Sequence, residues 1–420
     1  MVVRALSRIL VACVCGAVGL SLGRVAAAEP ILSVEPADSR ALLDKLVGLA
    51  RRRAPEVKLG RSALVASRAS YARARLAPVE NPLVEVKVDR GALGVTRDVT
   101  VAASLWLPVE IAGQRASRRR EASDYVRFHE ALLERSRAVA TGRTVRAFGA
   151  LAVATKRARV LEELLNGARA ESDYYAARVA VGDATERDAA FAALESARHE
   201  ALLSETRADV VESAGELFEL TGWSPEEGRT LDATLPALAR KLPGSVGQLR
   251  TPATAALEQR ARYHASTFER LGREAWPALG VGVTGGRGDY GEARFGAGLA
   301  YAFPLFRANQ VERAEAQAER TRTLDELELA RTLVRERMAV IERELAALGQ
   351  ALEVITNRAL PAADRAVAAA VETQRAGKGD WLGVLVSRRE LSALSLRRLE
   401  LLAKGWSLLG ELTEMTGEVP

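Results

Sequence analysis

The sequence has little cysteine, few aromatic residues and no strong excess of one charge. Its two cysteines, Cys13 and Cys15, both lie near the start, so a chain cleaved after residue 28 would contain neither a disulfide nor a cysteine metal ligand. An aromatic content of 5% and only 14 prolines favour packed helices over a large globular core. Stability must then come from helix packing and oligomerisation.

The charge balance excludes another class of protein. Removing the leader residues Arg4, Arg8 and Arg24 from the 60 basic residues leaves 57 basic against 54 acidic side chains. A nearly neutral chain gives no support to nucleic-acid binding.

Residues 1–28 are typical of an export signal. Basic residues precede an apolar run at 9–23, and Ala26-Ala27-Ala28 forms an A-x-A cleavage site before Glu29. About 15 apolar residues fall short of the about 20 that a membrane anchor needs. Acylation at Cys13, after Leu10-Val11-Ala12, is the alternative, but it would leave a very short apolar region, so cleavage after Ala28 is favoured.

The first half of the remaining chain, 29–223, is predicted to combine long helices with a strand pair. Apolar spacing predicts a helix at about 39–76, broken near Pro55, and alternation of apolar and polar residues predicts strands. The further elements are expected at these positions: strands at about 82–90 and 97–107, a helix at about 114–180, a turn at 181–185 and a helix at about 186–220. At about 1.5 Å per residue the helix at 114–180 extends about 100 Å, which excludes a compact domain.

The second half repeats this order after a polar, proline-containing linker at 224–252. Its elements are expected as a helix at about 254–273, strands at about 278–284 and 293–303, and helices at about 309–375 and 380–415, with Pro361 as the interruption of the first of these two helices. Placing Gly182 over Gly377 also places Glu195 over Glu390. The sequence therefore predicts two structural repeats, each a β-hairpin followed by a long α-helical hairpin.

The strands have the length and alternation of transmembrane β-strands, although a soluble hairpin with one solvent-exposed face would show the same pattern. Four such strands cannot close a barrel in lipid, because an open edge leaves backbone groups unsatisfied. The expected fold is mainly α with a small β part: a trimer whose 12-stranded β-barrel continues into a periplasmic α-helical barrel. Four aromatic residues are candidates for a membrane-interface girdle, with core packing as the alternative: Trp106, Trp276, Tyr301 and Phe303.

Two segments that lead from strand to helix carry a family resemblance. The first is Leu107-Pro108-Val109-Glu110 followed by Gly113-Gln114-Arg115 and Arg118-Arg119, and the second is Pro304-Leu305-Phe306-Arg307-Ala308-Asn309-Gln310. Together with Leu360-Pro361 and the turns that contain Gly182 and Gly377, they resemble the TolC-like outer-membrane efflux proteins, and more narrowly the heavy-metal (CzcC/CusC-like) branch. Ala112, the inserted Ala308 and Val311 depart from the branch pattern, which weakens the branch assignment and leaves the family assignment in place.

The resemblance implies a passive duct and no enzyme. It implies a homotrimer in outer-membrane lipid that receives cargo, heavy-metal cations in this branch, from an inner-membrane RND-type pump through a periplasmic adaptor (membrane fusion) protein. No cofactor and no metal site are expected, because His129, His199 and His264 are scattered and no usual ligand spacing occurs. A drug or type I secretion duct of the same fold is the alternative.

The two helical turns are the candidate functional sites. The family meets its adaptor at such turns, which here comprise Val181, Gly182, Asp183, Ala184 and Thr185, and Ala376, Gly377, Lys378, Gly379 and Asp380. Simple capped turns are the alternative. Four acidic residues are candidates for the closed aperture, although acids at helix starts are also dipole partners: Asp183, Glu186, Asp188 and Asp380.

Two other classes of protein are less consistent with the pattern. A periplasmic adaptor would have one helical hairpin flanked by β-domains, whereas two hairpins here each follow a strand pair. A coiled-coil scaffold would need sustained heptads and no strands.

Overall fold

The structure is a computed structural model of the full chain. It describes residues 39–76, 81–90, 99–224, 250–287, 292–304, 308–376 and 381–419. The chain divides into two units, Met1–Leu42 and Leu43–Pro420, and the described residues from Leu43 onward belong to the second.

The described residues of the first repeat form four helices and two strands. Helix α2 (Ser39–Arg53) ends just before Ala54, and the next helix begins with a proline at its first position, where the missing N–H costs nothing. The remaining elements are α3 (Pro55–Ala74), β1 (Leu83–Arg90), β2 (Val99–Val109), α4 (Gln114–Ala180) and α5 (Glu186–Thr221). The bounds of α4 are those expected from the sequence.

The second repeat has the same order. Its elements are α6 (Pro252–Glu274), β3 (Leu279–Arg287), β4 (Ala293–Ala300), α7 (Gln310–Val354), the π-helix η2 (Ile355–Ala359), α8 (Leu360–Arg375) and α9 (Trp381–Thr416). A mostly helical chain with a small antiparallel sheet confirms the coarse fold class expected from the sequence.

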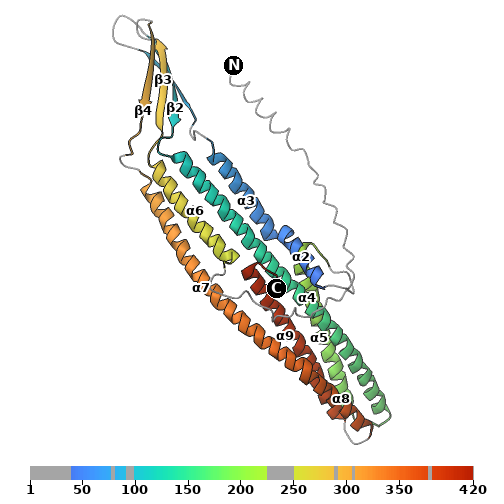
Figure 1. Ribbon diagram of the computed structural model, residues 1–420. Coiled ribbons are helices and arrows are strands. Elements are labelled where there is room, and N and C mark those ends of the chain that lie inside the picture. Colours follow the sequence, from blue (N-terminus) through green and yellow to red (C-terminus); the bar gives the residue numbers. More distant parts are fainter. Residues whose placement is uncertain are drawn as a thin grey trace, which may run out of the picture. The chain divides into compact units, whose positions relative to one another are not determined.

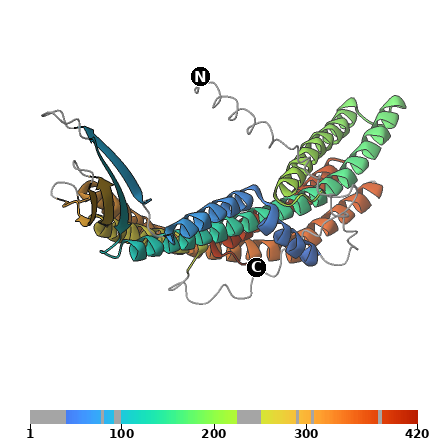
Figure 2. The ribbon, with the colours of Figure 1, turned by 90° about the horizontal axis from the view of Figure 1, so that it is seen from above.

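The helices pack as neighbouring columns (Figures 1 and 2). Helices α3 and α5 both contact α4, which on its other side contacts α6 and α9. Helices α6 and α9 also contact α7, and α8 contacts α9. Helix α4 therefore has several helical neighbours, which explains why its apolar residues are not confined to one narrow stripe.

Small residues bring α4 and α9 close together. A Cβ atom built on Gly149 would lie 2.2 Å from Cγ of Trp406, and one on Gly142 would lie 2.5 Å from the carbonyl oxygen of Gly410. The ring of Trp406 contacts Phe148 edge to face, with ring centroids 5.8 Å apart. The contact between the two repeats thus depends on glycine at these positions.

The four strands form one antiparallel sheet in the order β1-β2-β3-β4. The hairpins of the two repeats join through β2 and β3, where Leu105 pairs with Val283 and Leu107 with Val281. Strands β1 and β4 are the two outer strands of this sheet.

Three strand ends differ from the expectation. Strand β2 continues through Pro108 to Val109, because β1 pairs with β2 only as far as Trp106 and the missing N–H of the proline therefore breaks no bond to β1. Strand β3 runs past its glycines to Arg287, since both β2 and β4 pair with it there. Strand β4 stops at Ala300, short of the expected 303.

The long helix of the second repeat also differs, because η2 precedes the expected interruption at Pro361. The N–H of Leu360 bonds to the carbonyl of Ile355, the wider spacing of a π-helix. A proline ring clashes with the carbonyl four residues earlier, and the wider turn accommodates it.

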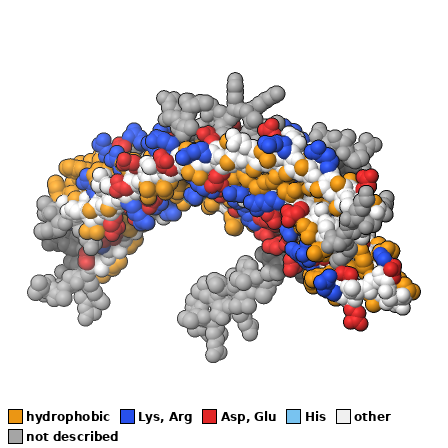
Figure 3. Space-filling view, turned by 90° about the horizontal axis from the view of Figure 1, so that it is seen from below, with side chains coloured by type: hydrophobic (Ala, Val, Ile, Leu, Met, Phe, Trp, Pro, Cys, Tyr) orange, Lys and Arg blue, Asp and Glu red, His pale blue; other side chains and the backbone are white. Residues whose placement is uncertain are grey.

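Among the helices in the described part of the chain, none has a stretch of residues long and apolar enough to cross a membrane. Along the face of the molecule in Figure 3, basic, acidic and apolar side chains are interspersed.

Candidate functional site

The sheet has one face made almost entirely of apolar side chains, here called the apolar face. Residues that pair across neighbouring strands point to the same side, so the register assigns each residue to a face. The apolar face consists of Val84, Val86 and Val88, Val99, Val101, Ala103, Leu105, Leu107 and Val109, Leu279, Val281, Val283 and Gly285, and Ala293, Phe295, Ala297 and Leu299, with the charged Arg287 at the end of β3. Most of these are exposed, and Phe295 is 87% exposed. The sequence alternation predicted such a face.

The opposite side, here called the polar face, combines charged, polar and very small residues. It carries Glu85, Lys87 and Asp89, Thr100, Ala102 and Ser104, Gly280, Gly282, Thr284 and Gly286, and Arg294, Gly296, Gly298 and Ala300. Trp106 belongs to this face, because it pairs with Leu83 and Gly282.

The four aromatic candidates do not share one environment. Trp106 is partly buried against the polar face, on the side opposite the apolar residues, which sets it apart from a lipid-facing girdle. Trp276 precedes β3 and is exposed, as is Phe303 after β4, and the ring of Phe303 contacts Tyr301 at a centroid distance of 5.0 Å. The alternation along β2 places Trp106 opposite Leu105 and Leu107, whereas the neighbours of its ring depend on the register between β2 and β3, which the sequence does not reveal.

The two strand-to-helix segments adopt the same local structure. Gly113 and Asn309, the residues before α4 and α7, both have positive φ, at 76° and 55°. The next residue in each case is a glutamine whose Oε1 accepts a hydrogen bond from the backbone N–H two residues earlier. Asparagine tolerates this left-handed conformation better than most residues, which explains how Asn309 can occupy in the second repeat the position that Gly113 has in the first.

The turn between α4 and α5 is exposed and closed by local contacts. Gly182 has φ 75°, and a Cβ added there would meet nothing within 4 Å. The guanidinium of Arg178 donates from Nε to Oδ2 of Asp183 at 2.8 Å, and this contact raises the pKa of Arg178. Val181 is 78% exposed at the tip.

Helix α5 starts with a capping box. The hydroxyl of Thr185 accepts from the N–H of Asp188 at 3.2 Å and donates to its Oδ2 at 2.6 Å. These bonds hold the pKa of Asp188 below its usual value. Of the aperture candidates, Asp183 and Asp188 are therefore engaged within the turn, and Glu186 is exposed in the first turn of α5.

The second turn falls mostly outside the described residues. Ala376 directly follows α8 and is exposed, whereas Gly377, Lys378, Gly379 and Asp380 are not described. Nearby, the amide of Gln374 on α8 donates to the hydroxyl of Tyr175 on α4 at 3.2 Å, so α8 and α4 are in contact close to both turns.

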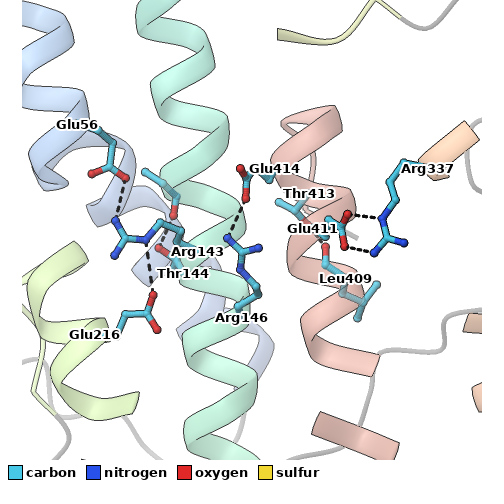
Figure 4. A network of polar contacts seen from close by, with 11 residues as sticks. Glu56, Arg143, Thr144, Arg146, Glu216, Arg337, Leu409, Glu411, Thr413 and Glu414 are labelled. Carbon is cyan, nitrogen blue, oxygen red and sulfur yellow. Dashed lines mark hydrogen bonds and ion pairs between the residues drawn. The ribbon is translucent and has the colours of Figure 1, made fainter. Parts of the chain in front are cut away.

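Ion pairs link neighbouring helices near the middle of α4, between the sheet and the turns (Figure 4). Arg143 on α4 lies 3.7 Å from Glu56 on α3 and 3.6 Å from Glu216 on α5. Arg146 pairs with Glu414 on α9 at 2.8 Å. Helices α7 and α9 are linked at the same level, where Arg337 donates two hydrogen bonds of 2.6 and 2.7 Å to Glu411 (Figure 4). The sequence did not single out these residues.

The structure also has a cavity of about 380 Å³ among α4, α5, α8 and α9. Glu195 is buried there and pairs with Arg389, and Glu171 pairs with Arg388. His199 lines the same cavity, and burial lowers its pKa. His129 and His264 lie elsewhere, each against a neighbouring tyrosine ring.

Solved outer-membrane proteins share this arrangement. The outer membrane protein VceC from Vibrio cholerae matches 90% of this chain over 97% of its own length, with a TM-score of 0.71 at 17% identity. CusC, described in terms of transmembrane channel formation, matches 89% of this chain over 91% of its own, with a TM-score of 0.73 at 13% identity. The Campylobacter jejuni outer membrane channel CmeC matches 94% over 90%, with a TM-score of 0.70 at 13% identity.

The chain has the fold of these outer-membrane channels. No protein-family model and no curated protein matches the sequence. At sequence identities of 13% to 17% these structural matches establish the channel fold, and a shared fold does not by itself establish a shared function.

Proposed function

We propose that the protein is the outer-membrane channel of a tripartite efflux system, which passively conducts cargo from an inner-membrane pump and a periplasmic adaptor to the exterior. The observation that carries this proposal is the two-faced sheet. An exposed apolar face across four strands, opposite a face of charged and small residues, fits a wall with lipid on one side and water on the other. No catalytic step is part of this function.

The outer strands of the sheet support assembly from several copies. Strands β1 and β4 end the sheet, and a β-structure in lipid must be closed because unpaired backbone groups are costly there. Three copies supply twelve strands for a barrel, with the helices as a periplasmic extension in a Gram-negative cell.

Two adjacent alanines on β2 give a matched test of the wall. Ala103 lies on the apolar face and Ala102 on the polar face, so A103R and A102R add the same side chain to opposite sides. An arginine facing lipid near the bilayer midplane costs about 2–4 kcal/mol, whereas one facing water costs little. We expect A103R to reduce the trimer recovered from outer membranes and A102R to assemble and conduct in planar bilayers. Equal recovery of both variants from the soluble periplasmic fraction would refute the proposal.

We further propose that the α4–α5 turn docks the periplasmic adaptor, together with 376–380. The turn is exposed and, at about 1.5 Å per residue, lies about 100 Å along α4 from the sheet. Asp183 and Asp188 already bond to Arg178 and Thr185 within the turn. We therefore propose Glu186 as the first candidate for a residue that lines the closed aperture, followed by Asp183, Asp188 and Asp380. A photo-crosslinker at Val181 should capture an adaptor in cells, whereas one at Val211, which is 73% exposed in the C-terminal part of α5, should not.

The cargo proposed from the strand-to-helix resemblance is heavy-metal cations, and a drug, small-molecule or type I secretion duct of the same fold is the alternative. Deletion of the gene should be compared for sensitivity to zinc, cobalt, cadmium and copper salts and to aromatic dyes. Unchanged metal tolerance with dye hypersensitivity would reject the metal cargo.

A further inference from the structure

The polar face of the sheet holds a groove at the end nearest the helices. Its volume is about 430 Å³, within the range of small-molecule sites. The groove is lined by Asn81, Leu83, Trp106, Pro108, Ala278, Gly280, Ala300, Tyr301 and Ala302. Residues from all four strands or their ends contribute, so the site exists only once the two hairpins have joined.

Glycines allow the indole of Trp106 to lie against the backbone of the neighbouring strands. A Cβ on Gly282 would come 2.4 Å from Cε3 of the indole, and one on Gly298 would come 3.1 Å from Cη2. The indole Nε1 donates to Oγ of Ser104 at 3.1 Å, so the polar edge of the ring has a partner within its own strand. An aromatic side chain over glycines stabilises a sheet, and here it also forms an apolar wall of the groove.

The chemistry of the lining selects the ligand. None of its nine residues is charged, and the polar side chains are the amide of Asn81, the phenol of Tyr301 and the indole itself. The charged members of the polar face, Glu85, Lys87, Asp89 and Arg294, lie outside the groove. A metal cation would find no carboxylate, thiolate or imidazole there, whereas a flat apolar ring gains both area burial and stacking.

We propose that this groove binds an uncharged planar aromatic molecule of one or two rings in contact with the indole of Trp106. In the proposed channel the polar face lines the conduit, so the groove would be a contact point for aromatic cargo entering the barrel. The role of the groove in cargo transport rests on the proposed channel function, whereas the binding of an aromatic molecule to the groove does not.

Binding can be measured on the full-length protein in amphipol with 6-propionyl-2-(dimethylamino)naphthalene, an uncharged two-ring probe whose fluorescence rises in an apolar site. We expect saturable binding that naphthalene displaces and Zn²⁺ does not. W106L should weaken binding about tenfold, the effect of losing an aromatic contact, and W106F should bind within about threefold of wild type. Trp276, exposed and outside the groove, offers the control W276L, which should leave affinity unchanged.

A second variant leaves Trp106 in place. Ala302 is exposed at the groove, so A302W should fold normally and fill the groove, which would abolish saturable binding. Wild-type affinity in both W106L and A302W, or fluorescence that rises without saturation, would overturn the proposal. Conductance in planar bilayers separates the two hypotheses, because a protein that conducts but does not bind the probe refutes only the groove, and one that binds but does not conduct refutes only the channel.

Discussion

Gln114 and Gln310 make the same hydrogen bond at the start of the long helix in each repeat. Oε1 of Gln114 accepts from the N–H of Ala112 at 2.8 Å, and Oε1 of Gln310 accepts from the N–H of Ala308 at 2.9 Å. Each glutamine follows a residue with positive φ. The duplicated sequence thus produces a duplicated bend from strand to helix, and this bend sets the direction in which each helix leaves the sheet.

The two glutamines should differ in their contribution to stability. Gln114 is only 4% exposed and also donates from Nε2 to the carbonyl of Trp276 at 2.7 Å, whereas Gln310 is exposed. We expect Q114A to lower the free energy of unfolding by about 1–3 kcal/mol and Q310A by less than about 1 kcal/mol. Urea unfolding followed by circular dichroism of the detergent-solubilised protein measures both, and equal losses would contradict the asymmetry.

Glycine at 149 should be required for packing, unlike glycine elsewhere on the same helix. A methyl group at Gly149 overlaps the ring of Trp406, which is itself buried, so G149A should destabilise by about 1–3 kcal/mol. Gly167 is an exposed position on α4 where an added Cβ meets nothing, and G167A should stabilise by up to about 1 kcal/mol. Thermal unfolding of the two variants should shift in opposite directions.

The capping box at Thr185 should stabilise the tip locally. T185A removes the hydroxyl partner of Asp188, at a typical cost of about 1 kcal/mol for a lost cap, and should speed hydrogen exchange in the first turn of α5 while leaving the rest of the helices unchanged. The pKa of Asp188 should rise toward its usual value. Thr332 provides the control, because its exposed hydroxyl bonds only to the carbonyl of Glu328 in its own helix, and T332A should not speed exchange. Unchanged exchange in T185A would show that the box does not hold the turn.

The pair between Arg337 and Glu411 should make stability depend on acid pH. Hydrogen bonds from Arg337 hold the pKa of Glu411 below its ordinary value of 4.5. A carboxyl group with a lowered pKa in the folded state contributes stability above its unfolded pKa, and this contribution is lost as the pH falls through the folded pKa. Wild type should therefore exceed E411Q in stability at neutral pH, and the difference should shrink below about pH 4.5.

The double variant R337Q/E411Q isolates this contribution. Compared with R337Q, it should show no such pH-dependent difference, because the carboxylate has already lost its partner. A constant gap between wild type and E411Q from neutral pH to about pH 3 would contradict the assignment.

Much of the helical organisation could be predicted because it depends on local signals. A glycine and a threonine mark the turn between α4 and α5, and the proline at 55 marks a helix start, since each residue type has a backbone preference that its neighbours do not override. The alternation along β2 likewise defined two faces. Such signals do not say which strands become neighbours.

Which residues surround Trp106 on its side of the sheet, by contrast, depends on the folded chain. Its environment is created by Gly282 and Gly298, residues of the other repeat, through a register between β2 and β3 that no local pattern specifies. The same holds for the contact of Gly149 with Trp406 and for the ion pairs around Arg143. The extent of α4, the turn between α4 and α5 and the two faces of β2 follow from backbone preference and periodicity, which are local properties of the sequence. The groove and the joints between repeats required the packed chain, because they arise from residues brought together by long-range pairing.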